Sequence, residues 1–158
     1  MPDYRLSIHI EDPFIGLVDE QWLKHVVETT LVIAGVRSPV AISLVIAGDE
    51  TVRNLNRTYR GVDSTTDVLA FALSGQVGDE YGHFIVPPDE PAQLGEVIIS
   101  YRQAEKQAGE QRHSLNRELA LLVAHGVLHL MGYDHEEPEG EQSMKAMESR
   151  VLDAIEKE

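Results

Sequence analysis

The sequence predicts a single domain of mixed α and β class, on three observations. Its 158 residues match the length of one domain, which is roughly 100–200 residues. A composition of 42% hydrophobic and 25% charged residues is that of a globular chain able to bury a core. Helical apolar periodicity interleaves with short β-branched runs, and no internal repeat or low-complexity segment is present.

The first half of the chain predicts three strands and two helices. Residues 4–10 alternate weakly, as an edge strand does, and a helix follows with Asp19 as its N-cap and Gly35 at its end. Residues 40–47 are apolar on both faces, which predicts a strand covered on two sides. We expect a second helix from an Asp49 N-cap to Gly61, and a strand at 67–73. The apolar face of this second helix is expected to contain Val52, Leu55 and Tyr59.

The second half predicts one long loop, one strand and three helices. Residues 74–93 are rich in Gly, Pro and acids, with room for a hairpin around 84–86. A strand at 94–100 leads into a helix starting at Tyr101, and Ser114 caps a longer apolar helix that ends before Gly132. The last helix opens at Pro138. Its apolar stripe contains Met144, Met147, Val151 and Ile155.

Composition excludes several classes of protein. With no cysteine, the chain has no disulfide and no thiolate, so any metal must be held by His, Asp or Glu. The sequence has no apolar segment of membrane-spanning length and no basic or apolar N-terminal signal, so we expect a cytoplasmic protein with no membrane partner. A formal net charge of −14 argues against non-specific binding of nucleic acid or anionic membranes.

Three of the seven histidines lie within eleven residues, at His125, His129 and His135. The first two are i and i+4 on a predicted helix, so their side chains share one face at about 5–6 Å. Gly132 can end that helix and turn the chain back toward the same face. Three imidazoles would leave one position of a single Zn²⁺ ion open to water, as in catalytic zinc sites. Imidazoles also suit other metals, so the spacing does not fix the ion.

The competing interpretation makes His125 and His129 hydrogen-bonded residues beside the core, and His135 a surface residue. The other histidines have no metal-site context and are expected to be structural. Asp134, next to the third candidate ligand, could orient an imidazole or act as an acid or base; otherwise it is a turn aspartate. Glu118, two turns before His125 on the same helix face, is a weaker candidate to support that ligand.

Two further features bear on the substrate. Zinc proteases of the His-Glu-x-x-His type carry their base directly after the first ligand, where this chain has Gly126. Arg53, Arg57 and Arg60 follow one side of the predicted second helix, and arginine suits phosphate oxygens. We expect Arg53 and Arg57 to be solvated or paired with acids, and Arg60, at the helix end, to carry function.

The block His125-Gly-Val-Leu-His129-Leu-Met-Gly-Tyr-Asp-His135 resembles the signature of the bacterial YbeY-type endoribonucleases. Residues 59–61, 66–69 and 94–100 are similar to the family's other blocks, in the same order. The resemblance implies an α+β fold with a small mixed sheet of about four strands and about five helices. It also implies zinc on His125, His129 and His135, with Arg60 at the phosphate. Ala70-Phe71-Ala72 stands where the family usually has Ser-Phe-Pro.

Our leading hypothesis is therefore a single zinc-dependent, single-strand-specific endoribonuclease domain over residues 1–158. Its RNA would be an rRNA precursor, matured at the 16S 3′ end, or defective rRNA, and its acidic charge suggests help from a ribosomal or ribosome-associated protein. Attack by a metal-bound hydroxide or by the ribose 2′-OH both remain open. One alternative is a zinc peptidase or amide hydrolase with Asp134 or Glu96 as base. Another is a non-catalytic ribosome-assembly factor.

Overall fold

The computed structural model describes residues 4–37, 39–72, 92–132 and 138–156. Within these ranges it has four strands, five α-helices and one short 3₁₀ helix. In chain order the elements are β1 (Tyr4–Ile10), η1 (Asp12–Phe14), α1 (Glu20–Ile33), β2 (Val40–Ala47), α2 (Asp49–Arg60), β3 (Val68–Ala72), β4 (Ala92–Ser100), α4 (Tyr101–Gln111), α5 (Leu115–Leu130) and α6 (Pro138–Glu156).

The four strands form one mixed sheet in the order β1-β2-β4-β3. β1 pairs with β2 and β2 pairs with β4, both in parallel. β3 pairs with β4 antiparallel and forms the edge of the sheet, from Val68 opposite Ile99 to Ala72 opposite Gly95. The α+β fold with a mixed sheet of about four strands and about five helices is thus confirmed.

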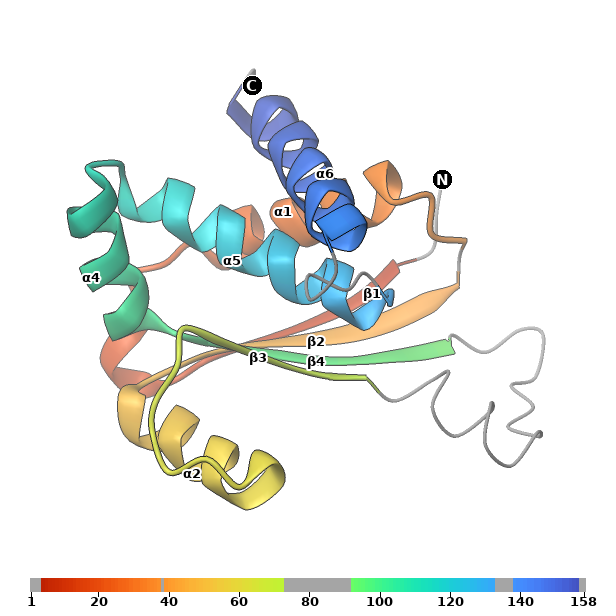
Figure 1. Cartoon of the computed structure of the whole chain (residues 1–158). Helices are drawn as coiled ribbons and strands as arrows, with labels where there is room; N and C mark the ends of the chain where they lie inside the picture. Colours follow the sequence, from red (N-terminus) through yellow and green to blue (C-terminus); the bar gives the residue numbers. More distant parts are fainter. Residues whose placement is uncertain (1–3, 38, 73–91, 133–137, 157–158) are drawn as a thin grey trace, which may run out of the picture.

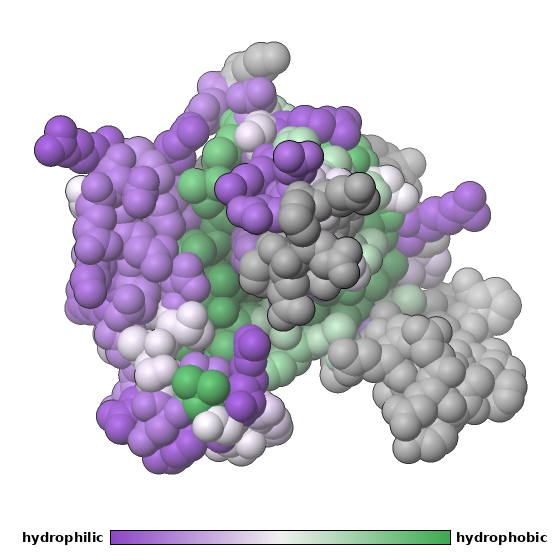
Figure 2. All heavy atoms as spheres, viewed as in Figure 1, coloured by the Kyte–Doolittle hydropathy of each residue, from purple (hydrophilic) through white to green (hydrophobic). Residues whose placement is uncertain are grey.

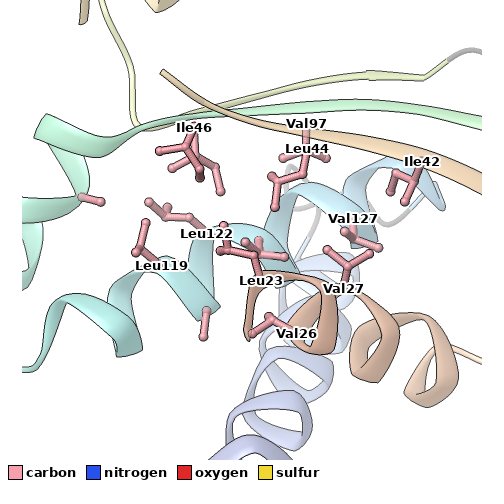
Figure 3. Close-up of a cluster of buried hydrophobic side chains, with 14 of the residues drawn as sticks. Leu23, Val26, Val27, Ile42, Leu44, Ile46, Val97, Leu119, Leu122 and Val127 are labelled. Carbon is pink, nitrogen blue, oxygen red and sulfur yellow. The ribbon is translucent and has the colours of Figure 1, made fainter. Parts of the chain in front are cut away.

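Helices cover both faces of the sheet unequally (Figure 1). α1, α5 and α6 lie on one face, α2 lies on the other, and α4 packs at the end of the sheet against α5 and α2. The larger core lies under α1 and α5, where Ile42, Leu44 and Ile46 of β2 meet both helices (Figure 3). A smaller cluster on the α2 face joins Val52 to the sheet. β2 is therefore covered on two sides, as its sequence predicts.

Local signals place most helix ends where the sequence predicts them. The Asp19 carboxylate accepts the backbone N–H groups of Gln21 and Trp22, and the Ser114 hydroxyl accepts that of Arg117. Gly61 ends α2 with φ +73°, a conformation that glycine adopts at little cost. These caps fix the starts of α1 and α5 and the end of α2.

Two expectations about α2 are wrong. Its N-cap is Gly48, not Asp49, because the Glu11 carboxylate accepts the Gly48 N–H at 2.8 Å and the helix starts one residue earlier. The Asp49 carboxylate instead accepts the Ser100 hydroxyl at 2.7 Å. Tyr59 is not on the buried face: its side chain is 68% exposed and meets Phe71 edge-on, with ring centroids 5.5 Å apart.

The remaining differences concern ends of elements. β4 begins at Ala92, two residues before the predicted strand, and α4 runs on to Gln111. The predicted hairpin around 84–86 lies outside the described residues. In the view of Figure 2 the surface over α4 is largely hydrophilic, as its exposed position at the sheet end requires. No helix in the described part of the chain combines the length and apolarity needed to span a bilayer.

Candidate active site

His125 and His129 lie on one face of α5, as the i and i+4 spacing predicts. Their ring centroids are 6.4 Å apart and the rings are tilted by 31°. His125 is half-buried and His129 is exposed, so the pair stands at the margin of the core. Gly132 follows the helix with φ +95°, the turn conformation that the sequence predicts. His135 and Asp134 lie outside the described residues.

A cavity of about 210 Å³ connects these histidines with two other elements. Arg60 reaches it from the end of α2, and Asp67 borders it just before β3. Val68, Ala70 and Gly126 complete the lining between β3 and α5. The structure therefore brings Arg60 to the two histidines, although it lies more than 60 residues before them. Ala70, where the YbeY-type pattern usually has serine, is part of this wall.

The segment between α2 and β3 is held by hydrogen bonds to Ser64 and Asp67. The Asn56 amide donates to the Ser64 carbonyl at 2.9 Å, and the Asp67 carboxylate accepts the Val68 N–H at 2.8 Å. The other Asp67 oxygen accepts the Gln107 amide of α4 at 3.2 Å. This loop is thus tied to both α2 and α4, which holds its ends beside the cavity.

Arg53 and Arg57 do not line this cavity. Arg53 forms a two-pronged pair with Asp63, at 2.8 and 3.2 Å, and Arg57 donates to the Asn54 amide oxygen at 3.1 Å. The pair with Asp63 raises the pKa of Arg53 and lowers that of the carboxyl. Both arginines border a separate open depression on α2 of about 660 Å³. The sequence interpretation that separated Arg60 from the other two agrees with this arrangement.

Glu148 of α6 meets His125 from the side of the helix bundle. Its Oε2 lies 2.9 Å from Nδ1 of His125, and its side chain is 16% exposed. This hydrogen bond is the main cause that raises the pKa of the His125 imidazole above its usual value, against burial, which lowers it. The carboxylates of Glu148 and Asp67 add smaller contributions in the same direction.

Glu118, the weaker candidate to support His125, contacts a different histidine. Its carboxylate lies 2.6 Å from Nε2 of His113, at the other end of α5. Seven residues of helix rise about 10 Å, so two residues on one face can still be far apart along the axis. Glu118 is buried by this contact, and His113 is the structural histidine that its sequence context indicates.

Gly126 is required by the close approach of α5 to the sheet. A Cβ at this position would lie 2.5 Å from one Val97 methyl and 3.3 Å from a Val68 methyl. A glutamate therefore cannot occupy the position that follows the first candidate ligand. Glu96 does not replace it, since Val97 faces α5 and its neighbour Glu96 points to the opposite face, where it is exposed. The expectation that Glu96 could act as base is wrong.

The imidazoles of His125 and His129 are suitable ligands for a metal ion. The described residues do not provide a complete set of ligands. Within residues 4–37, 39–72, 92–132 and 138–156, no three His, Asp or Glu side chains are grouped to hold a metal. Two histidines at one helix end, facing a polar cavity, are compatible with a third ligand from the segment after Gly132. The C-terminal end of a helix also favours a nearby cation.

Sequence reasoning missed two residues of this site. Asp67 belongs to the block Thr66-Asp67-Val68-Leu69, but no role was inferred for it. Glu148 carries a signal that was overlooked: it lies four residues after Met144 and three before Val151, both buried, so a carboxylate occupies the buried face of α6. A charged residue in such a stripe predicts a polar partner on the helix it contacts.

Comparisons with known proteins identify one family and one solved structure of similar fold. The family model described as "Endoribonuclease YbeY" matches residues 15–156. A protein of that name from Roseiflexus sp. (strain RS-1) is 42% identical over 95% of this chain and 92% of its own length. Another from Moorella thermoacetica is 43% identical over 84% of each chain. A solution structure from Thermotoga maritima covers 95% of this chain and 88% of its own, at 25% identity and a TM-score of 0.62.

Proposed function

The chain belongs to the endoribonuclease YbeY family and is an endoribonuclease, and from this premise we propose that it is a zinc-dependent enzyme that cleaves single-stranded rRNA precursors. In this proposal residues 1–158 form one catalytic domain that matures the 3′ end of 16S rRNA and removes defective rRNA. The observation that carries the proposal is the cavity shared by Arg60, His125 and His129. This cavity brings two side chains that can bind a metal ion together with one that can bind a phosphate.

His125, His129 and His135 would hold the ion, one zinc per chain. The first two are supported by their common face on α5, and His135 by its spacing after Gly132. A bound zinc ion supplies a Lewis acid to the phosphoryl group. Asp134, beside the third ligand in the sequence, is proposed as the acid or base that moves a proton at the ribose or phosphate oxygen.

Arg60 would bind the phosphate of the scissile bond. Its guanidinium can donate two parallel hydrogen bonds to phosphate oxygens and stabilise the charge that develops on them. It is at the C-terminal end of α2, on the rim of the cavity, and its two neighbours along the helix are engaged elsewhere. One arginine thus has both the position and the chemistry for the reacting phosphate.

The substrate must be recognised by more than charge. With a net charge of −14, free RNA is expected to bind weakly. We therefore include in the proposal a ribosomal or ribosome-associated protein that brings the enzyme to its RNA in the cytoplasm. The comparisons, which name endoribonucleases, give no support to the peptidase alternative.

The test combines metal content with cleavage of end-labelled RNA. The purified chain, its metal-free form and His129→Ala are compared on single-stranded and duplex RNA, with His9→Ala as control, since His9 is exposed on β1 at the far edge of the sheet. We expect cleavage only of single strands, lost on metal removal and restored by Zn²⁺. Cleavage by metal-free protein contradicts the proposal, as does a wild-type chain that never cleaves. A 2′,3′-cyclic phosphate on the products would identify attack by the 2′-OH.

A further inference from the structure

Glu148 is the hydrogen-bond partner of the candidate metal ligand His125, and it lies outside the sequence blocks that resemble the YbeY-type family. It lies on α6, 23 residues after His125, and its Oε2 is 2.9 Å from Nδ1 of that ring. Its side chain is only 16% exposed, between the buried Met144 and Val151. Burial of a carboxylate is unfavourable unless hydrogen bonds replace its water. The contact with His125 supplies one such bond.

The chemistry of the pair defines which nitrogen of His125 carries the proton. An ionised carboxylate only accepts hydrogen bonds, so the nitrogen facing it must be protonated. The proton of the neutral ring then sits on Nδ1, and Nε2 carries the lone pair through which an imidazole binds a metal. Carboxylates behind ligating histidines commonly fix both tautomer and ring orientation in this way.

We propose that Glu148 is the positioning residue of the metal site: it holds His125 in the Nδ1–H tautomer and presents Nε2 to the ion. The inference rests on the proposed function, because it assumes that His125 is a ligand. It adds that the metal site depends on α6, an element that contributes none of the three proposed ligands.

A second histidine–glutamate pair in the molecule lies away from the cavity. His113 and Glu118 are also within hydrogen-bond distance, but through Nε2 of the ring, and neither residue lines the cavity. Both pairs are largely buried. The side chains of His113 and Glu118 are 20% and 8% exposed, and those of His125 and Glu148 are 31% and 16% exposed. Glu118 therefore provides a matched control for the removal of a carboxylate from a histidine.

The first experiment measures zinc affinity by competition with a chromophoric chelator. We expect Glu148→Ala to weaken zinc binding about 10–100-fold, the usual effect of removing such a partner. Glu148→Gln should recover part of that loss, because its amide oxygen can accept the same hydrogen bond. Glu118→Gln should leave the zinc affinity unchanged. A Glu148→Ala protein that binds zinc within threefold of wild type overturns the proposal.

The second experiment reads the tautomer directly and needs no metal. Long-range ¹H–¹⁵N spectra of the metal-free chain, at a pH where His125 is neutral, should show Nδ1–H in wild type and a shift toward Nε2–H in Glu148→Ala. An unchanged tautomer overturns the proposal. If the alanine variant does not fold, Glu148→Gln carries both measurements, with a smaller loss of affinity expected; an affinity equal to wild type then overturns it.

The two experiments separate this inference from the proposed function. A wild-type chain that binds no zinc contradicts the proposed metal site, whatever the tautomer of His125. A wild-type chain that binds zinc, beside a Glu148→Ala variant that binds it equally well, contradicts only the role of Glu148.

Discussion

The two ends of α5 use the same pair of residue types for different purposes. At the start of the helix, His113 and Glu118 close on each other beside the Ser114 cap, five residues apart in the sequence. At its end, His125 is held by Glu148 from another helix, and His125 and His129 border a cavity with Arg60. The first arrangement stabilises the start of the helix. The second places the rings of His125 and His129 at a cavity that a ligand can reach.

The two pairs differ in where the histidine ring lies relative to the cavity. The local partner at the helix start contacts Nε2 of His113 away from the cavity, and Glu118 is buried there. A partner from α6 contacts Nδ1 of His125, and the His125 ring lies at the cavity wall. A histidine's function is therefore better judged from what lies beyond its hydrogen-bond partner than from the presence of one.

The largest effect is expected when the histidines at the two ends are replaced in turn. His129→Ala should lose bound zinc and abolish single-strand cleavage, since two remaining imidazoles hold a metal poorly. His113→Gln keeps a donor for Glu118 and should retain both. Metal analysis and a cleavage assay on each variant check this. Loss of zinc in both variants would contradict the claim that only the histidines at the cavity end of α5 bind the metal.

Arg60 tests whether the cavity end depends on groups from outside the helix. Arg60→Ala should lower kcat/KM about 10²–10³-fold, the typical loss of one donor to developing charge, with zinc content unchanged. Arg53→Ala is the matched variant, because Arg53 is on the same helix as Arg60 but pairs with Asp63 of the following loop, and it should cleave like wild type. Equal losses in the two variants would assign the effect to overall charge.

Gly126 tests the packing that places the cavity end against the sheet. Gly126→Ala adds a Cβ 2.5 Å from a Val97 methyl and should reduce the free energy of unfolding by about 1–3 kcal/mol. Gly109→Ala on α4 meets no atom within 4 Å and should raise it by about 0.5–1 kcal/mol. Thermal unfolding followed by circular dichroism measures both. A Gly126→Ala protein as stable as wild type would show that α5 can move away from β4.

The smallest effect is expected at the cap of the first end. Ser114→Ala removes the acceptor of the Arg117 N–H and should lower stability by about 1 kcal/mol. Zinc affinity and cleavage should not change, because the cap lies at the opposite end of α5 from the cavity. Urea unfolding and chelator competition test the two halves of this prediction. A drop in zinc affinity would mean that the ends are coupled through the helix.

Much of the fold could be predicted from the sequence because its signals are local. Asp19, Ser114 and Gly61 act within one turn of the chain, and the apolar run at 40–47 reports burial on both sides. The start of α2 was missed because Glu11, almost 40 residues earlier, binds the Gly48 N–H and sets the cap. Tyr59 was misplaced because helical periodicity does not show which turns of α2 are buried, and the exposed Tyr59 ring only meets Phe71 edge-on.

The candidate site divides in the same way. The shared face of His125 and His129 follows from helix geometry, and the special position of Arg60 follows from the glycine after it. Glu148 could not be assigned to His125, since nothing in the chain between them states how α6 packs on α5. Glu118 was only a weak candidate to support His125, because helical periodicity gives the face of a residue but not its height along the axis.

The dependence of His125 on α6 also sets an order of events during synthesis. Glu148 is added 23 residues after His125, which at about 5–20 residues per second is a delay of about one to five seconds. Until then a nascent chain has made its histidines but not the carboxylate that orients one of them. With Glu148 in its proposed role, the metal site is complete only after α6 has been synthesised, later than all three proposed ligands.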